Sequence, residues 1–158
     1  MKKKQCIEEI YKRHVDMVYR ICFTYMKNIA DTEDAVQTVF VKLMKSRKRF
    51  QNEEHEKAWL IVTATNTCKD LLKHWWRKNE DIQLFANTLS EGQKEPDFTE
   101  ELVLSLPDRY KTVLYLYYYE EYDSNEIAKI LHKRPQTIRA LLSEGRKLVR
   151  KKLENESN

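Results

Sequence analysis

The sequence predicts an all-α protein in which two small helical domains are joined by a flexible acidic linker. Glycine and proline, which interrupt helices, number only two and three in 158 residues. Apolar residues recur at three- and four-residue steps through most of the chain. Between residues 81 and 98 this periodicity fades, and glycine, proline and acidic residues gather instead. We therefore expect one domain over residues 1–80, a linker over 81–98 and a second domain over 99–158.

Two helices open the first domain. Apolar residues follow one helical face over residues 7–26, and this first helix is expected to end near Asn28. The second helix is expected to begin with Asp31 as its N-cap and to run to about Ser46. Its buried face would consist of Val36, Val39, Phe40 and Leu43.

Residues 54–78 are ambiguous by local preference alone. Their β-branched side chains, which favour strands, are Ile61, Val62, Thr63, Thr65 and Thr67. No glycine or proline interrupts the segment, and its length exceeds that of an ordinary strand. We therefore expect a third helix, with Trp59 in the core of the domain.

The second domain contains a short helix, a turn and a longer basic helix. Pro107 is placed to open the preceding helix at its first turn. Asp123 and Glu126 form a capping-box pattern, residues 132–134 form the turn, and Pro135 opens the last helix. This is the plan of a helix-turn-helix, whose second helix enters the DNA major groove. The residues alone leave two interpretations open, a DNA-reading unit and a helical hairpin that only packs on itself.

Nothing in the sequence suggests export or membrane insertion. No apolar run approaches the about 20 residues that a membrane span needs, and the N-terminus lacks the apolar core of a secretion signal. We therefore expect a cytoplasmic protein. Basic residues outnumber acidic ones over residues 1–80 and 111–158, whereas acidic residues dominate 81–110. This layout suits a protein that contacts a polyanion at both ends.

Catalytic, metal and cofactor sites are not expected. Cys6, Cys22 and Cys68 have no C-x-x-C spacing and are expected to be buried thiols. The four histidines form no zinc-binding pattern. Gly92 and Gly145 are the only glycines, so the chain has no glycine-rich phosphate loop. We expect no enzyme, no metal and no cofactor.

Two sets of motifs resemble the sigma-70 family of RNA polymerase sigma factors. Residues 106–153 look like region 4, which reads the minus-thirty-five promoter element. Residues 31–45, "DTEDAVQTVFVKLMK", resemble region 2.2 through the pattern D-x-x-Q-x-x-F at Asp34, Gln37 and Phe40. Residues 58–78 are similar to regions 2.3 and 2.4. The matching residues in region 4 are Leu106, Pro107, Glu126, Ile127, Ala128, Leu131, Thr137, Ile138, Leu142, Arg146 and Leu153, and those in regions 2.3 and 2.4 are Trp59, Leu60, Ala64, Asn66 and Asp70.

The two motif sets occur in the family's order and cover most of the chain. A chain with regions 2 and 4 only resembles the extracytoplasmic-function (ECF) group or its small clostridial-type relatives. The resemblance implies an alternative-type sigma factor that binds core RNA polymerase and directs promoter-specific transcription initiation. Its partners would be core RNA polymerase and promoter DNA. The family often has an anti-sigma factor too, but no residue of this chain identifies one.

The resemblance also implies roles for residues of the first domain. In the family, region 2.2 binds the clamp of the polymerase's largest subunit, which points here to Asp34, Gln37, Thr38, Val41 and Lys42. The third helix and the loop before it would meet the minus-ten element, with cations on the DNA backbone and an unstacked base held by the loop. The residues expected there are Phe50, Asn66, Lys69, Lys73, His74, Arg77 and Lys78.

In the second domain, the turn and the last helix would carry the minus-thirty-five contact. The residues expected there are Arg134, Gln136, Thr137, Arg139, Ala140, Ser143, Arg146 and Lys147. The chain departs from the family at His132, where the family often has glycine, and at Leu141 and Glu144, where it often has cations. Because histidine tolerates a positive φ better than most residues, we still expect the turn to form. The two lost cations predict a weaker hold on DNA.

One alternative fits part of the sequence. A helix-turn-helix transcriptional regulator that never joins polymerase would use the same second domain to bind DNA. It would leave the match of residues 31–45 to region 2.2 without an explanation.

Overall fold

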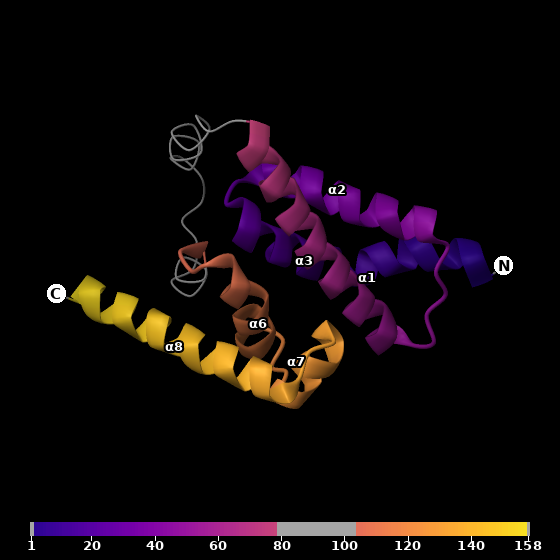
Figure 1. Cartoon of the computed structure of the whole chain (residues 1–158). Helices are drawn as coiled ribbons and strands as arrows, with labels where there is room; N and C mark the ends of the chain where they lie inside the picture. The colour runs from indigo at the N-terminus through magenta and orange to yellow at the C-terminus, as the bar shows by residue number, and fades with distance from the viewer. Residues whose placement is uncertain (1, 79–103, 158) are drawn as a thin grey trace. The chain divides into compact units, whose positions relative to one another are not determined.

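A computed structural model describes residues 2–78 and 104–157, with side chains described over residues 7–75 and 104–155. All regular structure in these ranges is α-helical, as the sequence predicts, and amounts to six named helices (Figure 1). The chain divides into two compact units, residues 1–94 and 95–158. The expected linker, residues 81–98, lies outside the described residues.

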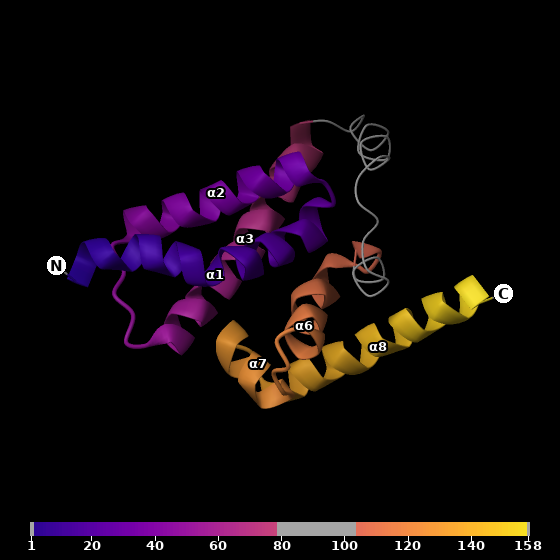
Figure 2. The same ribbon diagram turned by 180° about the vertical axis from the view of Figure 1, so that it is seen from behind.

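Unit 1 is a bundle of three helices, α1 (Lys2–Met26), α2 (Ile29–Ser46) and α3 (Glu53–Lys78). Each of the three packs against the other two. In both ribbon views α1 and α2 lie alongside each other and α3 crosses them (Figures 1 and 2). The fully buried side chains at the centre of this bundle include Val18, Ile21, Cys22, Ala35, Val39, Leu60, Ile61, Ala64 and Cys68.

The β-branched segment of α3 is helical, as its length predicts. Ile61 and Ala64 are fully buried in the bundle, so packing outweighs the local preference for strand. The Thr65 hydroxyl donates a 2.8 Å hydrogen bond to the Ile61 carbonyl one turn earlier, which satisfies a polar group inside the core. Trp59 corrects our expectation, because it is only half-buried near the start of α3 and not part of the core.

The start of α2 also differs from the prediction. Its N-cap is Asn28, not Asp31, and the helix begins at Ile29. The Asn28 side chain accepts a 2.8 Å hydrogen bond from the Asp31 backbone N–H and donates a 2.7 Å bond to the Asp31 carboxylate. The two residues therefore close the first turn together, with the negative charge of Asp31 at the positive end of the helix dipole.

Unit 2 consists of α6 (Asp108–Tyr118), α7 (Ser124–Leu131) and α8 (Pro135–Ser157). Each of these helices packs against the other two, with α6 and α7 on one side of the longer α8 (Figures 1 and 2). The predicted capping box at the start of α7 is present. Asp123 accepts from the Glu126 backbone N–H at 2.8 Å, and Glu126 accepts from the Asp123 backbone N–H at 3.1 Å.

The turn between α7 and α8 has the geometry of a helix-turn-helix. His132 adopts the left-handed conformation, with φ 57° and ψ 45°, and its backbone N–H bonds the Ala128 carbonyl. Pro135 opens α8 as predicted. Pro107, in contrast, is the N-cap residue of α6, one position before the first helical residue Asp108. Its φ of −59° suits either position, so the fixed ring angle does not discriminate between them.

Gly145 in the middle of α8 is explained by close contact with α6. A Cβ atom at this position would lie 2.9 Å from Leu114 Cδ1 and 3.2 Å from Leu114 Cγ. Leu114 is itself fully buried, so it has little room to move. Glycine therefore lets α8 approach α6 more closely than any other residue would allow.

We predict that Gly145→Ala lowers the free energy of unfolding of unit 2 by about 1 kcal/mol. An overpacking cost of about 1–3 kcal/mol is offset by the about 1 kcal/mol by which alanine favours helix over glycine. Amide hydrogen exchange in α6 and α8 of the full chain measures the change. In a Leu114→Val background, which removes the δ carbons but keeps a γ carbon, Gly145→Ala should destabilise less than it does in the parent chain. A stabilising effect in the parent chain would contradict the clash.

Candidate functional site

The outer face of α2 presents the residues expected to bind polymerase. Asp34, Gln37, Val41 and Lys42 are exposed, and 44% of the Val41 surface is accessible. Thr38 is half-buried, and its hydroxyl donates a 2.9 Å hydrogen bond to the Asp34 carbonyl of the same helix. The Thr38 hydroxyl is thus engaged within α2, and the exposed side chains beside it form the accessible part of this face.

Met44 belongs to the same face but was not predicted. It lies one helical turn after Val41, and 55% of its surface is exposed. An exposed valine and methionine side by side among polar residues make an apolar centre with a polar rim, as protein interfaces often have. The i, i+3 spacing of two large apolar residues outside the buried stripe was the sequence signal for it.

Lys42 links this face to α3. Its Nζ donates a 2.9 Å hydrogen bond to Thr67 Oγ1, and Thr67 is almost fully buried in the bundle. The aliphatic stem of Lys42 therefore lies across the junction of α2 and α3 while the residue as a whole stays exposed.

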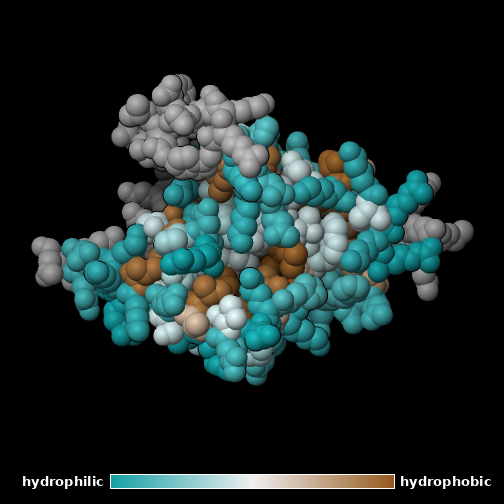
Figure 3. Space-filling view, in the orientation of Figure 1, coloured by the Kyte–Doolittle hydropathy of each residue, from teal (hydrophilic) through white to brown (hydrophobic). Residues whose placement is uncertain are grey.

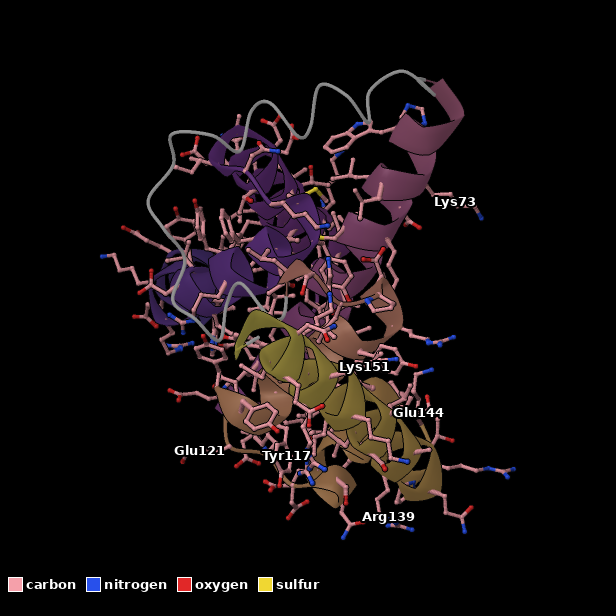
Figure 4. The ribbon with its side chains drawn as sticks, turned by 90° about the vertical axis from the view of Figure 1, so that its left-hand side faces the viewer. Lys73, Tyr117, Glu121, Arg139, Glu144 and Lys151 are labelled. Atoms are coloured by element: carbon pink, nitrogen blue, oxygen red, sulfur yellow. The ribbon has the colours of Figure 1, made fainter. Side chains whose placement is uncertain are left out.

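The outer face of α3 carries four of the residues expected to meet the minus-ten element. Asn66, Lys69, Lys73 and His74 are all exposed, and Figure 4 shows Lys73 extending away from the helix. Neither Lys69 nor Lys73 forms an ion pair with another described residue. Both ammonium groups are therefore available to an external anion. The side chains of Arg77 and Lys78 lie outside those described, although their backbone is helical.

Phe50 lies in the loop between α2 and α3 and is half-buried. Its ring packs edge-on against His55, with centroids 5.3 Å apart, and tilts against Trp59 at 5.8 Å. These ring contacts join the loop to the first turns of α3. Trp59 is half-buried because its ring packs against Phe50 of the loop and not in the bundle core.

The loop also exposes three consecutive cations, Arg47, Lys48 and Arg49. Arg47 adopts the left-handed conformation with φ 52°, which ends α2. None of the three forms an ion pair with a described residue. The run R-K-R was visible in the sequence as a phosphate-binding signal, but only Phe50 of this loop was predicted.

A partly buried charged group joins the start of α3 to α1, and no sequence signal predicted it. Arg13 of α1 donates two bonds of 3.0 Å and one of 3.1 Å to the Glu56 carboxylate. His14 Nε2 and Glu56 Oε1 share a hydrogen bond of 2.7 Å. Glu56 is 5% exposed and His14 is 7% exposed. The hydrogen bond with Glu56 raises the pKa of Arg13, so the guanidinium stays charged.

In unit 2, the turn and the first turns of α8 present a continuous exposed surface. Arg134 lies in the turn, and Thr137 and Arg139 lie in the first turns of the helix. Figure 4 shows Arg139 projecting away from the ribbon, and it forms no ion pair with a described residue. All of the expected contact residues except Arg146 are exposed, namely Arg134, Gln136, Thr137, Arg139, Ala140, Ser143 and Lys147.

Arg146 lies differently from the other expected contacts. It is half-buried, and its guanidinium carbon lies 4.4 Å from the centroid of the Tyr117 ring of α6. This cation–π contact directs the side chain toward α6. Arg146 therefore helps to hold α8 on α6, whereas Arg139 is exposed on the outer side.

The described surface is mainly hydrophilic, with small apolar patches in the face that Figure 3 shows. Among the described residues, no cluster of histidine, cysteine or acidic side chains could hold a metal ion. Nor does that part of the chain contain a helix long and apolar enough to cross a membrane. Cys22 and Cys68 are buried cysteines, as predicted, and the side chain of Cys6 lies outside those described.

Comparison with known proteins identifies the family. The model of sigma-70 region 2 matches residues 10–78, and the model of sigma-70 region 4 matches residues 99–149. RNA polymerase sigma factor SigV of Bacillus subtilis is 30% identical over 164 residues, which cover 99% of this chain and 98% of that protein. The chain belongs to the sigma-70 family.

Further relatives place it in the ECF group. ECF RNA polymerase sigma factor SigW of Bacillus subtilis is 26% identical, and the alignment covers 93% of this chain and 87% of SigW. ECF RNA polymerase sigma factor SigM of the same organism is 25% identical, and the alignment covers 91% of this chain and 93% of SigM. The protein is thus an ECF sigma factor, which directs promoter-specific transcription initiation with RNA polymerase. This family is not enzymatic, and a regulator that never joins polymerase would not account for region 2.

Region 2 of this ECF sigma factor covers α1 from residue 10 together with all of α2 and α3, and region 4 covers most of unit 2. The two positions where the family often has cations are engaged within the unit. Leu141 is half-buried, and Glu144 accepts a 2.9 Å hydrogen bond from the Tyr110 hydroxyl of α6. The bond from Tyr110 thus links Glu144 of α8 to α6.

Proposed function

We propose that this ECF sigma factor contacts core RNA polymerase with the outer face of α2 and promoter DNA with α3, the loop before it and α8. The observation that carries this proposal is the distribution of unpaired cations. Within the described residues, Lys69, Lys73, Arg139 and the Arg47–Arg49 run lie exposed without an ion pair, on the two units that match regions 2 and 4.

The α2 face suits a protein partner better than a nucleic acid. Asp34 would repel phosphate, whereas Val41 and Met44 offer an exposed apolar centre that water leaves readily on association. We therefore assign polymerase binding to Asp34, Gln37, Thr38, Val41 and Lys42, and add Met44 to this set. Lys42 would at the same time keep α2 and α3 in fixed relation through Thr67.

The minus-ten element would meet α3 and the loop before it. Lys69, Lys73 and the loop cations would neutralise backbone phosphates, which contributes affinity without sequence preference. A base that leaves the stack would be held by the loop, where the half-buried Phe50 packs on Trp59. Asn66 and His74 are placed to add polar contacts.

The minus-thirty-five element would meet the N-terminal half of α8. Helices of this type place their first turns in the major groove, and Gln136, Thr137 and Arg139 occupy those turns here. Arginine reads guanine and glutamine reads adenine through paired hydrogen bonds. Arg134, Ala140, Ser143 and Lys147 would contact the backbone or neighbouring base edges.

Two further expectations belong to this proposal. A cytoplasmic location follows from binding polymerase and promoter DNA. An anti-sigma factor would be a third partner, because the family often has one. Purification of the tagged sigma factor from uninduced cells would test for the anti-sigma factor, because a stable complex without core polymerase would identify such a partner.

Transcription from a genomic promoter library tests the function as a whole. Core polymerase with this sigma factor should produce run-off transcripts from a discrete set of promoters that core polymerase alone does not use. If the sigma factor neither co-purifies with core enzyme nor directs initiation from any promoter in the library, the proposed contacts with polymerase and DNA are wrong.

We predict that Asp34→Lys combined with Gln37→Ala weakens core binding at least tenfold, or about 1.4 kcal/mol. The charge reversal places a cation where the proposed polymerase surface would meet a carboxylate, which should weaken binding. Both side chains lie outside the bundle core, so the fold should not change. Competition against labelled wild-type protein measures the affinity. Asp16→Lys, the same charge change at an exposed position of α1, is the control and should leave core affinity unchanged. Unaltered affinity of the α2 double variant would refute the site.

We predict different effects for two arginines of α8. Arg139→Ala should cost about 1–3 kcal/mol at one base pair of the minus-thirty-five element and relax specificity there. Arg146→Ala should remove a cation–π contact and lower the stability of unit 2 by about 0.5–1 kcal/mol, with a smaller effect on specificity.

Holoenzyme binding to promoters substituted at each minus-thirty-five base pair measures these effects. Lys151→Ala, at an exposed position toward the C-terminal end of α8 (Figure 4), is the control and should not change base preference. If Arg146→Ala relaxes specificity as much as Arg139→Ala does, the two residues do not have the separate roles that their burial indicates.

A further inference from the structure

Arg13, His14 and Glu56 form a charged group next to the α2–α3 loop, residues 47–52, in which His14 and Glu56 are buried and Arg13 is exposed. Glu56 belongs to the first turn of α3, which begins at Glu53 directly after this loop. Its partners come from α1, 43 residues earlier in the chain in the case of Arg13. Arg13 Nε also lies 3.8 Å from the Glu53 carboxylate. The group therefore fixes the first turn of α3 against the middle of α1.

The end of the loop is joined in turn to this first turn of α3. The Asn52 side-chain oxygen accepts a 2.8 Å hydrogen bond from the His55 backbone N–H, and the Asn52 carbonyl accepts from the Glu56 N–H at 3.1 Å. The Gln51 N–H donates to His55 Nδ1 at 3.3 Å. A continuous set of hydrogen bonds thus runs from α1 through Glu56 to residues 51 and 52 of the loop.

Overall stability does not explain such a group. Removing the Glu56 carboxylate from water costs several kcal/mol, and a well-packed apolar residue of similar volume would serve stability as well or better. What a forked arginine–carboxylate contact provides is direction, because the donors and acceptors meet in one geometry only. The exposed pairs of α1, such as Lys12 with Glu8 at 3.7 Å, have no such geometry and contribute little.

The loop that this group holds is the one to which the proposed function assigns the unstacked base. Phe50 rests on His55 and Trp59, both in the early turns of α3. A rotation or shift of the first turn of α3 would therefore move Phe50. Its position relative to the rest of unit 1 depends on where α3 begins.

We propose that Arg13, His14 and Glu56 are positioning residues that hold the α2–α3 loop in the geometry for capturing a base of the minus-ten element, an inference that rests on the proposed function of this loop. The group contacts no DNA itself. It affects only the part of the DNA affinity that depends on the captured base. The affinity that comes from phosphate contacts does not depend on it, and neither does polymerase binding by α2.

Holoenzyme binding to single-stranded oligonucleotides tests this proposal. The probe is the non-template strand of a promoter that the enzyme uses, together with a series in which one minus-ten base at a time is replaced by an abasic site. In the wild type, the abasic site at the captured position should weaken binding about fivefold or more, as expected for loss of one stacked base. We call this loss of affinity the abasic effect.

Glu56→Gln keeps the shape of the side chain but removes its charge. We expect it to reduce the abasic effect at the captured position to less than about twofold, with affinity for the abasic strand and for core polymerase unchanged. Glu54→Gln is the matched control, because Glu54 is exposed in the same helical turn and its loss removes the same charge. This variant should behave as the wild type does.

A milder change in Arg13 guards against simple unfolding. Arg13→Lys retains the cation but not the forked contact, and should reduce the abasic effect partially while core affinity stays intact. If Glu56→Gln loses core affinity, this variant decides the question in its place. A full abasic effect in a variant that still binds core overturns the positioning role. If the wild type itself shows no sensitive position, the proposed function of the loop fails, and the positioning role fails with it.

Discussion

Helices α2 and α8 each bury one stripe of their surface and leave the opposite stripe to solvent, and the proposed contacts depend on this constraint. In α2, Ala35, Val39 and Leu43 fill the bundle, so the stripe that contains Asp34 and Val41 is free to meet a partner. In α8, Ile138 and Leu142 are buried, which leaves Arg139 and its neighbours outward. Helix α6, in contrast, is buried at every residue from Tyr110 to Leu116 and offers no outward stripe there.

Much of the fold could be predicted because local signals agree with the tertiary structure. The capping box at Asp123 and the proline at residue 135 specify their helix starts by backbone chemistry alone. At α2 the local signals compete, since Asn28 and Asp31 are both good caps, and only the bond between them shows that the earlier residue is the cap. Trp59 was misplaced because hydrophobicity does not reveal whether an aromatic ring faces a bundle core or a loop.

The exposed candidate residues were predictable for the same reason as the helices, because helical periodicity tells which side chains face outward. The contacts between helices were not. Arg13 with Glu56, Lys42 with Thr67 and Arg146 with Tyr117 each join residues far apart in sequence. Nothing in either local segment shows which partner the fold supplies. Gly145 is similar, because its cost within the helix is visible in the sequence while the Leu114 side chain that requires it is not.

The separation of packing residues from exposed residues along α8 has an evolutionary consequence. Gly145 and Ile138 are constrained by neighbours in α6 and α7, whereas Gln136, Thr137, Ala140 and Ser143 fill no space in the core. Substitutions at the second group leave the folded unit almost as stable as before. Duplicated copies of such a gene can therefore diverge in the promoters they prefer through a few surface changes, without first acquiring compensating mutations in the core.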